Sequence, residues 1–105
     1  MNNLFGLRES DIQNISDILN QFNEVSSAVI FGSRAKGNFT RGSDVDIAIK
    51  GEGLNLRITN KIGYILNEET LMPYKFDVID YNTITNPELK SHIKRAGIEF
   101  YKKDG

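Results

Sequence analysis

Two short apolar segments, residues 25–31 and 44–49, are joined by a polar loop that holds three glycines. Both segments are rich in β-branched residues, which favours strands. The loop over residues 32–43 has room for one helical turn, but not for the crossover helix that a parallel pair requires. The sequence therefore predicts two antiparallel strands, and any fold for this chain must contain them.

Helical periodicity flanks this pair on both sides. Apolar residues at three- and four-residue steps predict a helix over 12–22, and Ser10 with Gln13 forms a capping box at its start. A second apolar stripe predicts a helix over 54–66. Residues 75–81 follow as a third strand.

The last part of the chain carries clear helix punctuation. Asn86 is a suitable cap, Pro87 suits the first helical position, and Gly97 suits the residue just past the end. Residues 98–101 then alternate as a short final strand. The order helix, strand, strand, helix, strand, helix, strand predicts an α+β fold, in which a small mixed sheet carries helices packed on one face.

The size and charge of the chain narrow its class. The 105 residues fit one compact domain, residues 1–105, and the absence of cysteine excludes disulfide frameworks, thiolate zinc sites and cysteine nucleophiles. Thirteen basic residues nearly balance fourteen acidic ones, which argues against a strongly basic nucleic-acid-binding domain. The longest apolar run, residues 28–31, is far too short for a membrane helix, and the first residues do not form a signal peptide. We expect a soluble, cytoplasmic protein with no membrane partner.

Three aspartates are the strongest candidates for chemistry. Asp44 and Asp46 are two apart on a predicted strand, so their side chains share one face while Val45 and Ile47 point the other way. Asp77 lies in the third strand between apolar neighbours, where a charge needs a reason. Carboxylates held this close repel one another when ionised, and hard divalent ions such as Mg²⁺ relieve that repulsion.

The position of the third strand decides whether these acids meet. If it lies beside the strand that bears Asp44 and Asp46, all three carboxylates share one face of the sheet. Three carboxylates suffice to hold two metal ions about 4 Å apart, the arrangement that stabilises the attacking and leaving oxygens in phosphoryl transfer. We therefore predict Asp44, Asp46 and Asp77 as catalytic and metal-binding residues.

The loop before the acids suits a triphosphate. Gly32 at a strand end lets the backbone approach a phosphate closely, and Ser33 offers a hydroxyl. Arg34, Lys36 and Arg41 supply positive charge, and the sequence leaves open which of them points inward. We predict these five residues as the nucleotide-binding set. The spacings of a P-loop, an EF-hand and a dinucleotide-binding fingerprint are all absent.

These residues resemble a known family. Gly32-Ser33, ten intervening residues and then Asp44-Val45-Asp46 are similar to the signature of the polymerase-β-type nucleotidyltransferases, and the fuller string over residues 31–47 resembles their smallest branch, the MNT-domain proteins. The strand around Asp77 and the tail over residues 97–101 extend the resemblance over nearly the whole chain. Lys36 departs from the pattern, where arginine is the more frequent residue.

The resemblance implies a reaction and a partner. It implies that Asp44 and Asp46 bind two Mg²⁺ ions, that Asp77 completes the site and helps activate the attacking hydroxyl, and that the glycine-serine pair binds the triphosphate of ATP. MNT proteins of this size are commonly encoded beside a HEPN-domain partner. The resemblance therefore implies the antitoxin of a toxin–antitoxin pair, an adenylyltransferase that AMPylates a tyrosine of the HEPN toxin.

Two other functions stay open. The domain could neutralise its partner by contact alone, with a catalytically silent site. It could instead be a small-molecule or RNA nucleotidyltransferase, in which case a second subunit must hold the acceptor, and nucleic acid enters only in that role. The sequence does not decide the acceptor, the base of the nucleotide, or whether the chain forms a homodimer or a hetero-oligomer.

Overall fold

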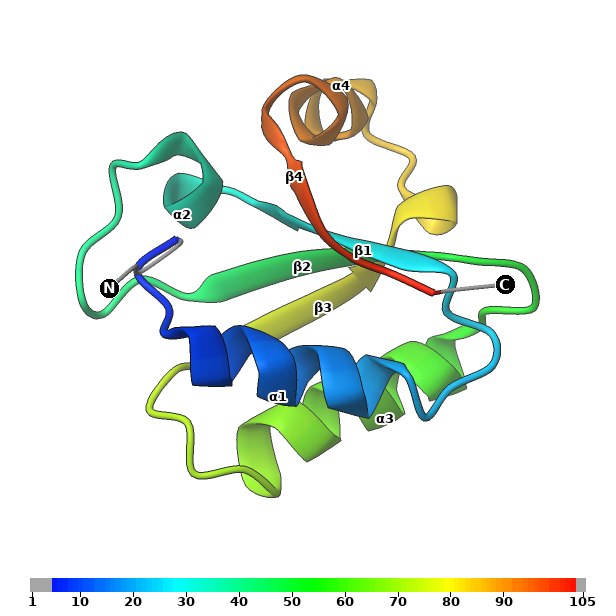
Figure 1. The fold of residues 1–105 in the computed structure, drawn as a ribbon. Helices are drawn as coiled ribbons and strands as arrows, with labels where there is room; N and C mark the ends of the chain where they lie inside the picture. The colour runs from blue at the N-terminus through cyan, green and yellow to red at the C-terminus, as the bar shows by residue number, and fades with distance from the viewer. Residues whose placement is uncertain (1–4, 104–105) are drawn as a thin grey trace.

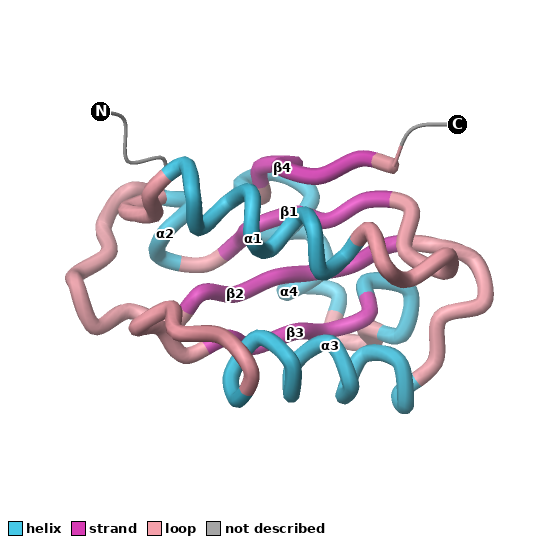
Figure 2. The backbone as a smooth tube through the Cα atoms, turned by 60° about the horizontal axis from the view of Figure 1, so that its bottom comes forward, coloured by secondary structure: helices cyan, strands magenta, loops and turns pink. Residues whose placement is uncertain are grey.

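A four-stranded mixed sheet with the strand order β3-β2-β1-β4 forms the centre of the molecule, as seen in a computed structural model that describes residues 5–103 (Figures 1 and 2). The strands are β1 Ser27–Phe31, β2 Val45–Lys50, β3 Phe76–Asp80 and β4 Ile98–Lys102. The helices are α1 Glu9–Leu19, α2 Ser33–Lys36, α3 Leu56–Glu68 and α4 Pro87–Ala96, with a short 3₁₀ helix, η1, over Tyr81–Thr83. The predicted α+β class is confirmed.

The pairing of the strands follows from the lengths of their connections. β1 pairs antiparallel with β2, as the short loop between them requires, and also antiparallel with β4. β2 and β3 pair in parallel, and α3 supplies the crossover that a parallel pair needs. Figure 2 shows the four strands side by side with α3 running along the β3 edge. The third strand therefore lies beside the one that bears the paired aspartates.

One face of the sheet is covered by α1 and α3 (Figure 1). Ile15 and Leu19 of α1 and Ile62 and Leu66 of α3 are fully buried there. They pack against side chains from alternate positions of β1 and β2: Ala28, Ile30, Val45, Ile47 and Ile49. Burial of each large aliphatic side chain contributes about 1.5–3 kcal/mol, which makes this layer the main source of stability.

The other face of the sheet is partly covered by α4, which differs from the expected one-sided arrangement. Ile93 of α4 packs with Val29 and Phe31 of β1 and Ala48 of β2. The physical reason is that the apolar run of β1 buries side chains on both faces, so the second face also needs a cover. Asp46 and Asp77 lie on this second face but outside the apolar cluster under α4.

The start of α1 also differs from the prediction. The N-cap is Arg8, and the reciprocal partner is Asp11, whose Oδ2 accepts from the Arg8 backbone N–H at 3.0 Å. The predicted capping box of Ser10 and Gln13 is wrong, because both residues lie inside the helix. The helix ends at Leu19 rather than at residue 22.

The start of α4 agrees with the prediction. Asn86 caps the helix, Pro87 begins it, and Gly97 follows its end. The η1 turn after β3 was not anticipated; it begins at Asp80, whose Oδ1 accepts from a backbone N–H of the turn at 2.9 Å. No helix within residues 5–103 has the length and apolar character needed to cross a bilayer.

Candidate active site

The parallel pairing of β2 and β3 brings two of the predicted acids together. Asp46 and Asp77 are register partners. Side chains of register partners point to the same face, and neighbouring strands lie about 4.8 Å apart, so the two carboxylates are adjacent. Asp44 lies two residues before Asp46, immediately ahead of β2. The conditional expectation that β3 lies beside β2 is thus confirmed.

The proximity of these acids is visible in the pKa of Asp46. Burial raises the pKa of this carboxyl, and the carboxylates of Asp77 and Asp44 raise it further, while Arg34 partly offsets the effect. Each cause opposes ionisation except the last. The site therefore carries excess negative charge, and a bound cation would stabilise it.

The glycine-serine turn directly adjoins this carboxylate cluster. Phe31, at the end of β1, is the register partner of Asp46, and Gly32 follows with φ 77° and ψ −153°, a conformation that only glycine adopts readily. A Cβ at Gly32 would overlap Asp46 Oδ2 and lie 3.3 Å from its Cγ. The backbone thus approaches the carboxylate more closely than any side chain would permit, and Ser33 begins α2 at the same point.

The donor set of this cluster suits a hard divalent ion. The candidate ligands are all carboxylate oxygens, which favour Mg²⁺ or Mn²⁺ over metals that prefer nitrogen or sulfur. In the part of the chain that is described, no three acidic or histidine side chains already close around one point as a preformed metal-binding group. Asp46 nevertheless lies near enough to Asp77 and to Asp44 for their charges to oppose its ionisation, and a bound cation would offset that repulsion.

Arg34 is buried and hydrogen-bonded to the backbone of the loop. Its side chain is only 2% exposed. Its Nε and Nη2 donate to Ser43 O at 3.2 and 2.8 Å, and its Nη1 donates to Phe5 O at 2.8 Å. Each nitrogen of the guanidinium is thus engaged with the backbone, and nucleotide binding by Arg34 stays a prediction.

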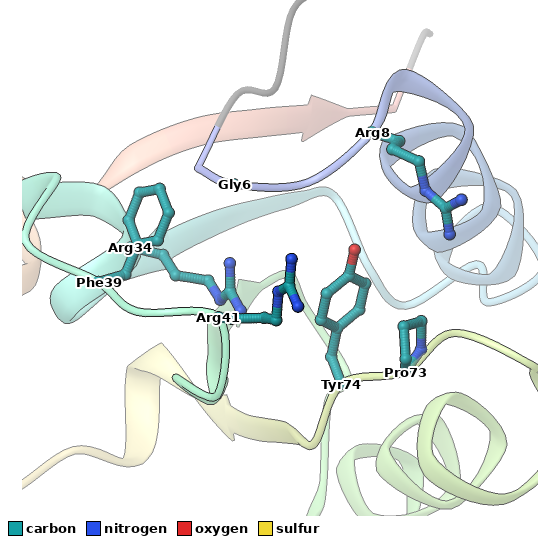
Figure 3. Close-up of a pocket in the computed structure, with 7 residues that line it drawn as sticks. All are labelled: Gly6, Arg8, Arg34, Phe39, Arg41, Pro73 and Tyr74. Atoms are coloured by element: carbon teal, nitrogen blue, oxygen red, sulfur yellow. The ribbon is translucent and has the colours of Figure 1, made fainter.

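The two other predicted cations remain accessible. Lys36 is exposed at the end of α2, on the turn that follows Gly32 and Ser33. Arg41 is exposed in the loop before β2, and its side chain lies with that of Arg34 in a cavity on the α1 side of the sheet (Figure 3). Of the three predicted cations, only Lys36 keeps a position beside the glycine-serine turn.

Sequence reasoning missed that Tyr74 packs against Arg34 and that Asp11 anchors Tyr74. The Tyr74 ring centroid lies 5.2 Å from Arg34 Cζ, and the Tyr74 hydroxyl donates to Asp11 Oδ2 at 2.8 Å. Asp11 is buried and also accepts from the backbone N–H of Arg8. Because 63 positions separate Tyr74 from Asp11, no local pattern in the sequence could have revealed this contact.

The sheet carries carboxylates on two neighbouring parallel strands, and a glycine-serine turn lies against them. This arrangement agrees with the site of the polymerase-β-type enzymes. The fold and the site together therefore indicate the nucleotidyltransferase class. The family follows from the sequence. Residues 13–105 match the family described as "Polymerase beta, Nucleotidyltransferase", and the chain belongs to that family. No curated protein gives a significant match.

Several solved structures with this fold come from toxin–antitoxin complexes. The chain is similar to one in a toxin–antitoxin complex with AMP-PNP, with a TM-score of 0.75 and 19% identity, covering 90% of this chain and 75% of that one. It is also similar to a chain in a complex of tri-AMPylated Shewanella oneidensis HEPN toxin with MNT antitoxin, with a TM-score of 0.70 and 15% identity, covering 90% and 72%. A variant of the MntA-HpeT toxin–antitoxin complex gives a TM-score of 0.69 and 16% identity, covering 93% and 75%. At these identities the likeness shows the fold.

Proposed function

We propose that this protein is a metal-dependent adenylyltransferase that transfers AMP from ATP to a tyrosine of a HEPN-domain toxin, and so acts as the antitoxin of the pair in the cytoplasm. The observation that carries the transferase site is the register pair Asp46 and Asp77 against the turn at Gly32. The partner and the tyrosine acceptor rest on the family resemblance. The Shewanella oneidensis complex supports them, because the HEPN toxin there is AMPylated.

The acids would hold two Mg²⁺ ions, with Asp44, Asp46 and Asp77 as ligands. When bound, such ions neutralise the triphosphate and stabilise the attacking and leaving oxygens. Because Gly32 has no side chain, the backbone of the turn lies directly against Asp46, and a triphosphate bound at the turn would lie close to the acids. Ser33 donates its hydroxyl to a phosphate oxygen, and Lys36 offsets the remaining negative charge.

Asp77 is the residue closest to solvent among the acids in the two strands. It is exposed, whereas Asp46 is half-buried, and β3 is an edge strand of the sheet. A hydroxyl on the surface of another protein can therefore reach Asp77 without entering an enclosed pocket. This openness favours a protein acceptor.

The transfer is a single displacement at the α-phosphorus. The acceptor oxygen forms a bond to that phosphorus, the bond to the bridging oxygen breaks, and pyrophosphate leaves. The proton of the acceptor hydroxyl passes to the carboxylate of Asp77, which acts as the general base. Atoms and charge balance without any further reactant.

The test uses the purified protein together with the protein encoded by its neighbouring gene. With α-labelled ATP and Mg²⁺, we expect label on a tyrosine of the partner, located by mass spectrometry, and none with Asp46→Asn. Asp17→Asn, on the exposed side of α1, is the matched control and should keep full labelling. Full labelling by Asp46→Asn would end the assignment. Toxin neutralisation that persists in Asp46→Asn, with no label in either protein, would establish the contact mechanism instead.

A further inference from the structure

A second concave surface lies on the α1 side of the sheet, away from the face that bears Asp46 and Asp77. It is a cavity of about 510 Å³ whose walls come from three separate segments: Gly6 and Arg8 near the N-terminus, the loop with Arg34, Phe39 and Arg41, and the turn at residues 73–74 (Figure 3). Three arginines line it and no acidic residue does. The proposed transfer reaction uses none of this surface.

The protein neutralises only part of the positive charge of this cavity. Arg8 pairs with Asp11 at 3.4 Å, and this is the only ion pair found among residues 5–103. Arg34 and Arg41 thus have no carboxylate within ion-pair distance in that part of the chain. A buried cation such as Arg34 is costly to the fold unless an anion compensates it.

Arg34 is also fixed in direction. Its Cζ lies 5.3 Å from the Phe39 ring centroid and 5.2 Å from that of Tyr74. All three guanidinium nitrogens donate to backbone carbonyls, which holds the side chain in one orientation. Arg41 lines the same cavity as Arg34 and Tyr74 (Figure 3). Like charges that line one cavity repel each other, and a bound anion would offset that repulsion.

We propose that this cavity is a binding site for a phosphate-type anion. Arg8 and Arg41 supply exposed contacts, and the buried guanidinium of Arg34 adds positive charge to the wall. The planar fork of arginine matches the oxygens of a phosphate group, and charged hydrogen bonds of this kind are the strong ones. Because the cavity walls hold no carboxylate, the anion binds without a divalent cation. Pyrophosphate released by nucleotide transfer and the 5′-phosphate of a free nucleotide share this chemistry.

Isothermal titration calorimetry on the full chain tests the site directly. Pyrophosphate, inorganic phosphate and AMP are titrated separately in low salt with EDTA, so that the metal site cannot contribute. We expect one saturable site, weakened about tenfold by Arg41→Gln and by Arg8→Gln, the loss typical of one charged contact. Tighter binding of pyrophosphate than AMP identifies the reaction product as the source of the anion, and the reverse order identifies the free nucleotide.

Two control variants separate this site from general charge effects and from the metal site. Arg57→Gln removes the same charge at the exposed start of α3 and should leave anion affinity unchanged. Asp46→Asn should retain binding in EDTA. The proposal is overturned by the absence of saturable binding for all three anions, or by an equal loss in Arg57→Gln. Binding that requires Mg²⁺ and disappears in Asp46→Asn would likewise overturn it, because the anion would then occupy the active site.

Discussion

Replacing Gly32 by alanine should have two separate effects, one on backbone strain and one on the position of Asp46. The backbone there has φ 77° and ψ −153°, and holding a residue with a Cβ in that region costs about 1–3 kcal/mol. In addition, the new Cβ would overlap Asp46 Oδ2, so the carboxylate must rotate away from the turn. The first effect lowers stability, and the second displaces a predicted metal ligand.

The expected size follows from these terms. A loss of about 2 kcal/mol in a domain of this length lowers Tm by roughly 8–16 °C. Gly37→Ala is a matched control, because Gly37 also has positive φ, 87°, but nothing lies within 4 Å of its added Cβ. It should cost about 1–2 kcal/mol from the left-handed backbone alone. Gly42→Ala has neither problem and should stay within about 0.5 kcal/mol of the parent protein.

Urea denaturation measures these stabilities, and calorimetric titration with Mn²⁺ measures binding at the acids. We expect Gly32→Ala to lose both divalent-ion binding and AMP transfer, while Gly37→Ala keeps both at a similar loss of stability. If Gly32→Ala bound Mn²⁺ and transferred AMP as well as Gly37→Ala, the close approach of this turn to Asp46 would have no functional meaning.

Three further substitutions test the surroundings of the site. Asp46→Asn removes a carboxylate whose pKa is raised by burial and by its acidic neighbours, so in EDTA at neutral pH it should be more stable to urea than the parent, and lower stability would contradict the repulsion. Tyr74→Phe should cost about 1.5–3 kcal/mol, because it removes a hydrogen bond to a carboxylate. Burial raises the pKa of Asp11, but hydrogen bonds from Tyr74 and Arg8 outweigh this effect and lower the pKa below its ordinary value. The resulting stabilisation is therefore present above about pH 4 and is lost as the pH falls through the lower pKa of the folded state. Urea midpoints measured between about pH 6 and 2 should decline less in Tyr74→Phe than in the parent protein. Arg34→Lys should cost about 2–4 kcal/mol by urea denaturation, because one ammonium cannot reach two separate backbone carbonyls in the fork geometry, whereas Lys36→Gln on the exposed end of α2 should change stability by less than about 0.5 kcal/mol.

Part of this site could be predicted from the sequence, because some of its features depend only on residues that are close together in the chain. The antiparallel pair follows from the length of the loop. The common face of Asp44 and Asp46 stays a prediction, because β2 begins at Val45 and Asp44 lies just outside it. To place Asp77 beside the other acids, one must also know which strand β3 pairs with. A helical crossover can reach either side of the pair, and the structure shows that β4 occupies the free edge of β1.

The role of Arg34 could not be predicted, because burial of a loop arginine depends on contacts that are distant in sequence. In a polar loop beside paired carboxylates, Arg34, Lys36 and Arg41 look alike as candidate phosphate ligands. Only the folded chain shows that Phe5 and Tyr74 surround Arg34. The cover on the second face was missed for a related reason, since an apolar run in β1 shows that both faces are buried without showing which helix covers each.

The segment over residues 32–46 contains three cations and two acids, yet none of them pairs with another in the described structure, where the one ion pair joins Arg8 to Asp11. A flexible loop of this composition would fold back and neutralise itself. Two features prevent this: strand pairing fixes Phe31 against Asp46, and Arg34 ties the middle of the loop to Ser43 O. Asp46 and Asp77 consequently lie on one face of the sheet, and Arg34 and Arg41 line a cavity on the other side. Arg34 offsets only part of the negative charge around Asp46, so a net charge of −1 conceals an acidic region and a basic one, and the first suits a cation and the second an anion.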